Sequence, residues 1–500
     1  MRMKKKVAFI LAILYLICML AVFSSAAQIT DSGSCGEKMS WTLDSDGILT
    51  ISGIGKIEKT SWLDSHYANE IKSVIINNGM TELTTDWIPS YVKEISIPAT
   101  VTKIPELFTT LNYLERITVN SQNAFFRSDN NGILFDKSMT TLFRVPIACE
   151  LSDFIIPDSV STVHGSAFYN CKNLKTLTIG QNVTIDTDQP DGINFNTFNL
   201  CTCPQLERII VNENNPFYSN DASGVLFDKN KSLLIVYPRG NQQSSYTVPE
   251  GVSIITNRAF HEHEYIKHIS LPSSLERIGW GAFTFSNLEE VFIPKNVNSI
   301  YAYAFAECKN MTRLTVDPEN ACFSNDAVGA LFDKFKTEIL QYPSASPYSI
   351  YSIPDTVKRI GSEVFISSKN IRGIIVPASM QDGRYIGGCN FLMCPNLSAV
   401  YYEDDTPSVV DSLRKHLNKA SLEDTVIYTN FDISSIASGD VNFDGEITVA
   451  DARLTLRKSV NLDSFIDKQI NIADVDKSGE ITTADARIIL RVVVGLETIE

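Results

Sequence analysis

Two stretches near the C-terminus carry oxygen-bearing side chains at a spacing that suits a hard metal ion. The first runs from Asp440 to Asp451 and the second from Asp474 to Asp485. Each has Asp, Asn or Ser at positions 1, 3 and 5, Gly at position 6 and Asp at position 12. Ca²⁺ takes about six to eight oxygen ligands, and loops with this spacing supply them. The spacing therefore predicts two calcium loops, with a generic acidic turn as the alternative.

The two predicted loops differ in charge at one ligand position. Position 5 is Asp444 in the first loop and Ser478 in the second, which makes the second site poorer by one charge and weaker. The glutamates at position 7 would give backbone carbonyls, and the threonines at position 9 would act through water. The predicted ligands are Asp440, Asn442, Asp444, Glu446, Thr448 and Asp451 in the first loop, and Asp474, Asp476, Ser478, Glu480, Thr482 and Asp485 in the second.

Each loop leads into a predicted helix, over residues 450–457 and 484–491, but the helix that would enter the first loop of an EF-hand is missing. Two loop–helix units with Asp at position 12 resemble the type I dockerin family over residues 437–498. That resemblance implies calcium-dependent folding, with two Ca²⁺ ions, and docking onto a cohesin module of a scaffoldin, as in cellulosomes. By the family pattern, the partner-binding residues are Val449, Ala450, Arg457, Thr483, Ala484 and Arg491.

The two copies are nearly identical at these partner-binding positions, so a two-fold-related, dual binding mode is a hypothesis. Some dockerins have small hydroxyl residues at loop positions 10 and 11. Val449 and the two alanines depart from that pattern and leave the cohesin type open. A solitary calcium-stabilised domain is the alternative to docking, and metal binding would be coupled to folding in either case.

The elements that carry this C-terminal unit form a long repeat. A proline recurs after an apolar residue, a phenylalanine stands eleven residues later, and uninterrupted copies are 22 or 23 residues apart. Short alternating stretches, such as 266–271 and 288–293, read as strands with one face inward. A constant spacing predicts one unit stacked on itself, here about fourteen turns between residues 70 and 400. The phenylalanines are Phe168, Phe260, Phe283, Phe305 and Phe365.

A longer module recurs three times within the repeats. Its signature is Gly, two apolar residues, Phe, Asp and Lys, beginning at Gly132, Gly224 and Gly329, with an Asp three residues earlier. We interpret it as a turn into a β-hairpin, with Gly at positive φ and Asp-Lys in a second turn. Turn chemistry is favoured over calcium or sugar sites, because the pattern recurs wherever the fold does.

These patterns resemble the BspA-like leucine-rich repeats of bacterial surface and secreted proteins, over about residues 33–430. The resemblance implies recognition of another macromolecule or surface and no catalysis. Residues 33–53 look like the family's opening β module, and residues 399–428 look like its strand–helix–strand cap. Insertions at about 185–196 and 380–390 interrupt the period, and we expect them to form loops. The predicted fold is a mainly β solenoid followed by a small all-α dockerin.

One position, three residues after the repeat phenylalanine, is predicted to be a buried slot. A small thiol fills such a slot well, so mostly reduced cysteines are favoured over disulfides. His263 occupies the same slot, which disfavours a zinc site with His261. The slot residues are Leu111, Cys171, Cys203, His263, Cys308, Ser368 and Cys394.

Composition indicates a globular protein, and the pattern of the first residues indicates export. It has 500 residues, 43 Lys and Arg against 58 Asp and Glu, and a net charge of −15, which argues against a nucleic-acid partner. A basic start and an apolar run predict a cleaved signal peptide, with an uncleaved anchor as the alternative and no later membrane span. The predicted parts are 1–27 signal peptide, 28–70 N-terminal cap, 71–430 repeats with C-terminal cap, 431–438 linker and 439–500 dockerin.

The sequence predicts a secreted, non-catalytic binding protein attached to a cellulosome-type complex for polysaccharide degradation. A dockerin-borne glycoside hydrolase and a protein-binding inhibitor or protector of the complex are the alternatives. The partner of the repeats, protein or polysaccharide, stays open. Aromatic residues that would stack on sugar rings are equally consistent with core or turn positions: Trp62, Trp87, Trp280, Tyr301 and Tyr303.

Overall fold

The computed structural model describes residues 27–58, 60, 68–84, 86–104, 111–184, 199–432, 436–443 and 446–499, without the side chains of residues 467 and 468. The predicted signal peptide up to residue 26, the predicted insertion at 185–196, Trp62, Asp444 and part of the predicted linker lie outside the described residues. Two compact units divide the chain. One comprises Met1–Asp186, Asn196–Leu206 and Ile210–Asn215, and the other comprises Thr187–Phe195, Glu207–Ile209 and Pro216–Glu500.

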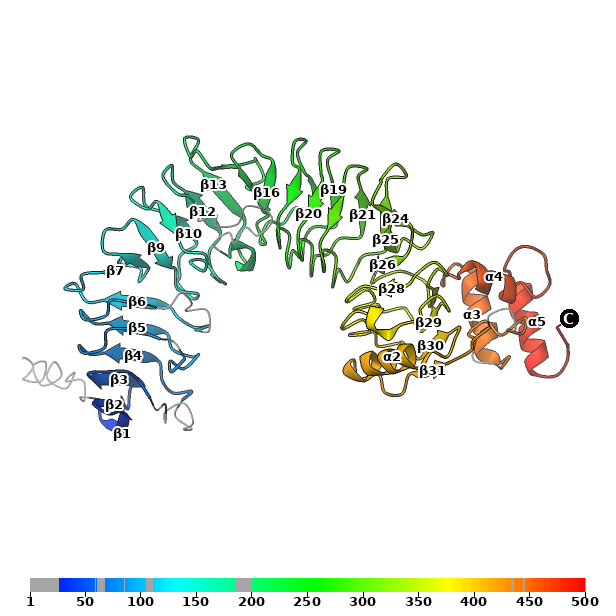
Figure 1. Cartoon of the computed structure of the whole chain (residues 1–500), viewed down its shortest axis with the longest axis horizontal. Helices are drawn as coiled ribbons and strands as arrows, with labels where there is room; N and C mark the ends of the chain where they lie inside the picture. Colours follow the sequence, from blue (N-terminus) through cyan, green and yellow to red (C-terminus); the bar gives the residue numbers. More distant parts are fainter. Residues whose placement is uncertain are drawn as a thin grey trace, which may run out of the picture. The chain divides into compact units, whose positions relative to one another are not determined.

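The first unit is built of short strands that pair one after another (Figure 1). Antiparallel β1 and β2 open a sheet that β3 continues in parallel with the following strands. The sheets are β1 (Ile29–Gly36), β2 (Met39–Asp44), β3 (Ile48–Gly53), β4 (Ser73–Ile76), β5 (Glu94–Ile97) and β6 (Arg116–Val119); β7 (Phe126–Ser128), β8 (Leu134–Asp136), β9 (Thr141–Arg144) and β11 (Thr162–Val163); and β10 (Asp153–Ile155), β12 (Thr176–Ile179) and β13 (Arg208–Val211), with the 3-10 turn η1 (Leu200–Thr202). Of β13, Ile210 and Val211 belong to this unit.

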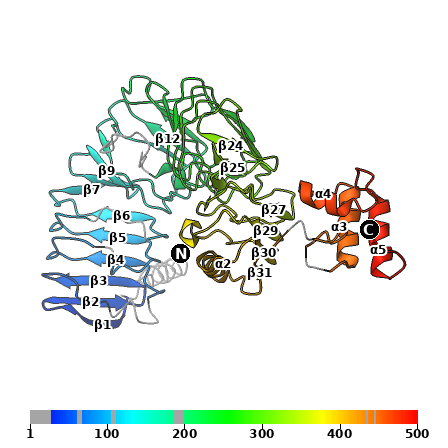
Figure 2. The ribbon, with the colours of Figure 1, turned by 45° about the vertical axis from the view of Figure 1, so that its right-hand side comes forward.

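The second unit continues the same alternation of longer and two-residue strands and then becomes helical (Figure 2). Its sheets are β14 (Tyr218–Asn220), β15 (Leu226–Asp228), β16 (Leu233–Val236), β18 (Ile254–Ile255), β20 (Arg277–Ile278) and β22 (Ser299–Ile300); β17 (Ser245–Thr247), β19 (His268–Ser270), β21 (Glu290–Ile293) and β23 (Arg313–Val316); β24 (Phe323–Asn325), β25 (Leu331–Asp333), β26 (Glu338–Gln341) and β28 (Arg359–Ile360); and β27 (Ile350–Ser352), β29 (Gly373–Val376), β30 (Ala399–Tyr402) and β31 (Val426–Tyr428).

The described helices lie in the second unit. They are α2 (Pro407–Lys419), α3 (Val449–Ser459), α4 (Asp467–Ala473) and α5 (Thr483–Val493), and the 3-10 turn η2 (Gly383–Tyr385) lies in the predicted loop at 380–390. The predicted strand–helix–strand cap is formed by β30, α2 and β31, and α2 buries Val409, Leu413 and Leu417. In the part of the chain that the structure describes, no helix is long and apolar enough to cross a bilayer.

The predicted repeat positions form the core. Phe260, Phe283 and Phe305 stack on one another, with ring centroids 5.0 and 5.3 Å apart. All seven slot residues are buried, as predicted. The Cys308 thiol donates to the Phe283 carbonyl of the preceding turn at 3.1 Å, so the slot takes a small donor as well as a small volume. None of the nine described cysteines forms a disulfide.

The three longer modules are hairpins, as predicted. Their signature glycines Gly132, Gly224 and Gly329 have φ of 77°, 77° and 89°, and the strands on either side of each glycine pair antiparallel. The Asp326 carboxylate accepts the Ala330 N–H at 2.9 Å and the Tyr351 hydroxyl at 2.7 Å. These carboxylates therefore stabilise the turn itself, which is the favoured interpretation of the motif.

A buried asparagine fastens each hairpin module, and the repeat pattern did not single it out. The Asn320 amide donates to the Pro294 and Val297 carbonyls, each at 2.9 Å, and its carbonyl accepts the N–H of Phe323. Asn123 and Asn215 make the matching bonds to earlier turns. Each asparagine stands three residues before the buried aromatic of its module, and that spacing is the signal that identifies it.

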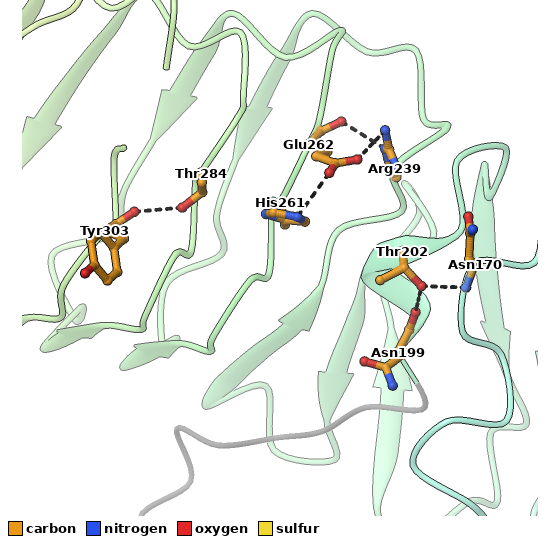
Figure 3. A network of polar contacts seen from close by, with 8 residues as sticks. All are labelled: Asn170, Asn199, Thr202, Arg239, His261, Glu262, Thr284 and Tyr303. Carbon is orange, nitrogen blue, oxygen red and sulfur yellow. Dashed lines mark hydrogen bonds and ion pairs between the residues drawn. The ribbon is translucent and has the colours of Figure 1, made fainter. Parts of the chain in front are cut away.

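Polar side chains also join neighbouring turns at the surface (Figure 3). Arg239 bridges to Glu262, which also lies 3.4 Å from the His261 ring. Separately, the Thr284 hydroxyl donates to the Tyr303 carbonyl at 2.7 Å. His263 is fully buried, and its Nδ1 accepts the Ile266 N–H at 3.1 Å. Burial lowers the pKa of His263 to about 4, so its ring is neutral at pH 7.

Candidate functional site

The second predicted calcium loop gathers three carboxylates. Ligand atoms of Asp474, Asp476 and Asp485 all lie within 4.8 Å of one another. Asp485 is fully buried, Asp474 is half-buried and Asp476 is exposed. Three negative charges this close repel one another unless a cation or hydrogen bonds offset them. Their hard oxygen atoms fit Ca²⁺.

Backbone N–H groups of the loop already point at these carboxylates. Asp474 accepts the Ser478 N–H at 3.0 Å and the Gly479 N–H at 2.8 Å. The Ser478 side chain and N–H lower the pKa of Asp476 by hydrogen bonding. The turn that allows this is left-handed at Gly479, whose φ is 87°. The Ser478 hydroxyl donates to the Glu480 carbonyl at 3.0 Å, while the Glu480 residue is exposed.

Position 12 of each loop also lies in the first turn of a helix. In the second loop, the Asp485 carboxylate accepts the Thr482 N–H at 2.8 Å, and the Thr482 hydroxyl accepts the Ala484 N–H at 3.1 Å. This reciprocal pair is a capping box at the start of α5. Thr482 is therefore the N-cap of α5, in addition to its predicted role as a calcium ligand through water.

The first loop repeats this geometry almost bond for bond. Asp451 accepts the Thr448 N–H at 2.8 Å and the Asn442 N–H at 2.9 Å, and it caps α3. Asp440 and Asp451 are both buried, and Glu446 is exposed. Asp444 lies outside the described residues. Burial of these carboxylates without a cation is costly, which is consistent with the ligand chemistry of the second loop.

The loop–helix pair has a small core of its own. The buried apolar residues are Val441, Ala452, Phe465, Ala473, Val475 and Ile489. A short helix, α4, precedes the second loop, and the sequence pattern did not indicate it. Its seven residues follow Phe465 without a strong periodic pattern, so only the packing of this core defines the helix.

The predicted partner-binding residues fall on two faces. We define the first docking face as Val449, Ala450 and Arg457, and the second docking face as Thr483, Ala484 and Arg491. Val449 is 58% exposed, and Thr483 is exposed at the same helix position. Arg457 pairs with Asp463 at 2.6 Å, and Arg491 pairs with Glu497 at 2.8 Å. The two faces thus match in helix position and ion pairing, and in residue type at two of their three positions.

The repeats carry a separate groove of about 340 Å³ beside β22. Tyr301 and Tyr385 are 40% and 47% exposed there, and Tyr303 is half-buried. The Glu338–Arg359 ion pair, at 3.4 Å, also lines the groove. Of the other aromatic candidates, Trp280 is 38% exposed, whereas Trp87 is a core residue.

Comparison with known proteins identifies both parts. The model of the BspA type leucine-rich repeat region matches in six copies, over residues 145–222, 239–332 and 344–436, together more than half of the chain. The model of the dockerin type I domain matches residues 438–493. No curated protein sequence matches the chain.

Similar solved structures are bacterial proteins. A leucine-rich repeat protein from Eubacterium ventriosum is 21% identical, with 74% of this chain and 84% of that chain covered and a TM-score of 0.42. A leucine-rich cell surface protein from Faecalibacterium prausnitzii is 17% identical, with 74% and 76% covered and a TM-score of 0.32. The pneumococcal vaccine antigen PcpA is 14% identical, with 81% and 100% covered and a TM-score of 0.33. On the family models, this chain belongs to the BspA-type leucine-rich repeat proteins and carries a C-terminal type I dockerin domain.

Proposed function

We propose that this chain is an exported, non-catalytic binding protein that docks onto a cohesin module of a scaffoldin. The repeats recognise a macromolecule or surface, and the dockerin attaches them to a polysaccharide-degrading complex. The type I dockerin match carries this proposal, together with the convergence of Asp474, Asp476 and Asp485 within 4.8 Å. In this proposal, residues 28–430 bind the partner and residues 439–500 form the docking domain.

Two Ca²⁺ ions would stabilise the folded dockerin domain. The ligands proposed for the second ion are the three clustered carboxylates with Ser478, the Glu480 carbonyl and Thr482. The first ion would take the matching residues of the first loop. Calcium supplies a charge that offsets the carboxylates, while Asp451 and Asp485 tie each ion to the first turn of a helix. Docking would then depend on calcium because the helices that carry the docking faces depend on it.

Capture of cohesins by the full chain tests the docking. A panel of immobilised cohesin modules should retain the chain with millimolar-range Ca²⁺ and release it with a chelator, as expected where ligand binding and folding are linked. The Asp474→Ala/Asp485→Ala variant should not be retained, whereas Glu480→Gln should behave as wild type because the Glu480 residue is exposed. A chain retained equally well without calcium would contradict the proposal.

The groove lined by Tyr301, Tyr303 and Tyr385, which we call the aromatic groove, is the proposed contact of the repeats with their partner. Exposed tyrosines beside an ion pair offer both stacking faces and hydrogen-bonding groups. Cell-wall polysaccharides and secreted proteins should be titrated against the full chain and against Tyr301→Ala/Tyr385→Ala. Tyr91→Ala is a matched control, because Tyr91 is 48% exposed elsewhere in the repeats. Release of reducing sugars by the wild-type chain would favour the hydrolase alternative.

A further inference from the structure

Two late strands of the repeats, β29 and β30, are buried on both faces, unlike β21 earlier in the same unit. Along β21, exposed and buried residues alternate, with Glu290 and Phe292 exposed. In β29 and β30, all eight residues are buried. We call the additional buried row, Ile350, Gly373, Ile375, Ala399 and Tyr401, the apolar strip. A row of this kind needs a cover, because apolar surface left in water is unfavourable.

Phe443 of the first calcium loop packs on the apolar strip. It is 2% exposed and shares one buried cluster with Ile350, Ile375 and Tyr401. The Tyr401 ring lies edge-on to it, with centroids 6.3 Å apart, and the Tyr401 hydroxyl donates to the Asn442 carbonyl at 3.2 Å. Gly373 makes room for this tyrosine, since a Cβ there would lie 3.1 Å from the ring.

The second loop has no counterpart to this anchor. The residue at the same loop position is Lys477, which is exposed. Both residues have the same left-handed backbone, with φ of 61° at Phe443 and 56° at Lys477. The loop conformation therefore accepts either side chain, and the phenylalanine serves the contact with the strip rather than the turn. A bridge between Tyr348 and Ser464 adds a second connection to the repeats.

This contact turns the first docking face toward the repeats. Ala450, Arg453 and Arg457 of α3 line a cleft of about 440 Å³ whose other wall includes Ser349, Arg372 and Ser398. A stable protein interface needs roughly 800 Å² on each partner. A protein module that contacted Ala450 and Arg457 together would therefore have to enter the cleft, although Val449 and Ala450 are exposed to water. Thr483 and Arg491 of the second docking face are also exposed, and they do not line this cleft.

We propose that Phe443 holds the dockerin against the apolar strip, so that the repeats obstruct the approach of a cohesin to Ala450 and Arg457 of the first docking face, and only the second docking face binds cohesin. This proposal rests on the proposed cohesin docking. It replaces the dual binding mode expected from the near-identity of the two copies. As long as the Phe443 contact is made, cohesin binds in one orientation only, through the second docking face.

Matched variants of the full chain test the asymmetry with a cohesin that the wild-type chain captures. Ala450→Arg and Ala484→Arg place the same bulk and charge on equivalent positions of the two faces. Ala484→Arg should weaken binding by about 100-fold, as for a disrupted interface centre, while Ala450→Arg should change it less than about threefold. Phe443→Lys gives the first loop the residue of the second, and in that background Ala484→Arg should bind within about tenfold of wild type. The proposal is overturned if Ala484→Arg alone binds normally, or if the double variant stays inactive while Phe443→Lys binds.

Hydrogen exchange tests the contact without any cohesin. In calcium, Phe443→Lys should speed exchange in residues 442–457 and in β29 and β30, and it should leave residues 474–491 unchanged. Equal exchange in the two proteins would overturn the coverage of the first face. A wild-type chain that captures no cohesin would instead overturn the proposed function, and the exchange result would still decide whether the contact exists.

Discussion

In the repeats, each turn adds a phenylalanine that packs on the next, whereas in the dockerin each copy adds carboxylates that repel one another. The Phe283 and Phe305 rings stack at 5.3 Å, and the slot between turns is filled by buried, uncharged side chains. Asp474, Asp476 and Asp485 converge within 4.8 Å. The repeats therefore depend on contacts between neighbours, and the dockerin depends on a cation.

Removing calcium should separate the two regions most clearly. With a chelator, the dockerin should lose its helices. In a small metal-dependent domain the free energy of metal binding, about 10 kcal/mol, is also the free energy that holds the domain folded. The transition of the repeats should stay in place. Differential scanning calorimetry of the full chain with and without chelator measures both. A dockerin transition that survives chelation would break the comparison.

Loss of one position-12 carboxylate should have the next largest effect. Asp485→Ala removes a proposed ligand and the cap of α5, so we expect calcium affinity at that loop to fall by about 100-fold or more and the helix to lose roughly 1 kcal/mol. Isothermal titration with Ca²⁺ measures the affinity. Glu480→Gln is the control, and an equal loss in the control would contradict the assignment of Asp485.

Acid should weaken the repeats through a buried neutral group. The pKa of His263 is lowered by burial to about 4. Its contribution to the stability of the folded repeats is therefore complete above pH 6.5, the ordinary pKa of histidine. This contribution is lost as the pH falls toward 4. At pH 5 the loss is about 2 kcal/mol. His263→Cys, which places the commonest slot residue there, should lose less stability between pH 7 and pH 5 in urea unfolding. Equal losses in the two proteins would contradict this interpretation.

A reductant should have the smallest effect. The described cysteines are free, and burial raises the pKa of the Cys308 and Cys394 thiols to about 12. The unfolding temperature should therefore move by less than about 1 °C with dithiothreitol, since no disulfide is lost. Iodoacetamide should label the half-buried Cys322 and Cys389 first. A large shift with reductant would show that the slot thiols are not the reduced core groups described here.

Periodic features were predictable from the sequence, and contacts between unlike parts were not. The slot that holds Cys171, Cys308 and His263 follows from spacing alone, because each turn meets the same neighbours. The capping roles of Thr448 and Thr482 needed the structure, since the same positions also suit a calcium loop. Phe443 has no phenylalanine at the equivalent position of the second loop, and its partners Ile350 and Tyr401 lie 93 and 42 residues earlier. No period connects such residues, so only folding brings them together.

The hairpin modules have a consequence for cooperativity along the repeats. Among the described residues, one ladder ends at β22 and the next begins at β24, and β23 and β27 likewise belong to different sheets. Across that boundary, the buried Asn320 side chain supplies bonds that a ladder supplies elsewhere. Turns within a block should unfold together, while blocks separate more readily. The segment that can be duplicated or lost without breaking a ladder is then the block that one module opens, rather than the single turn.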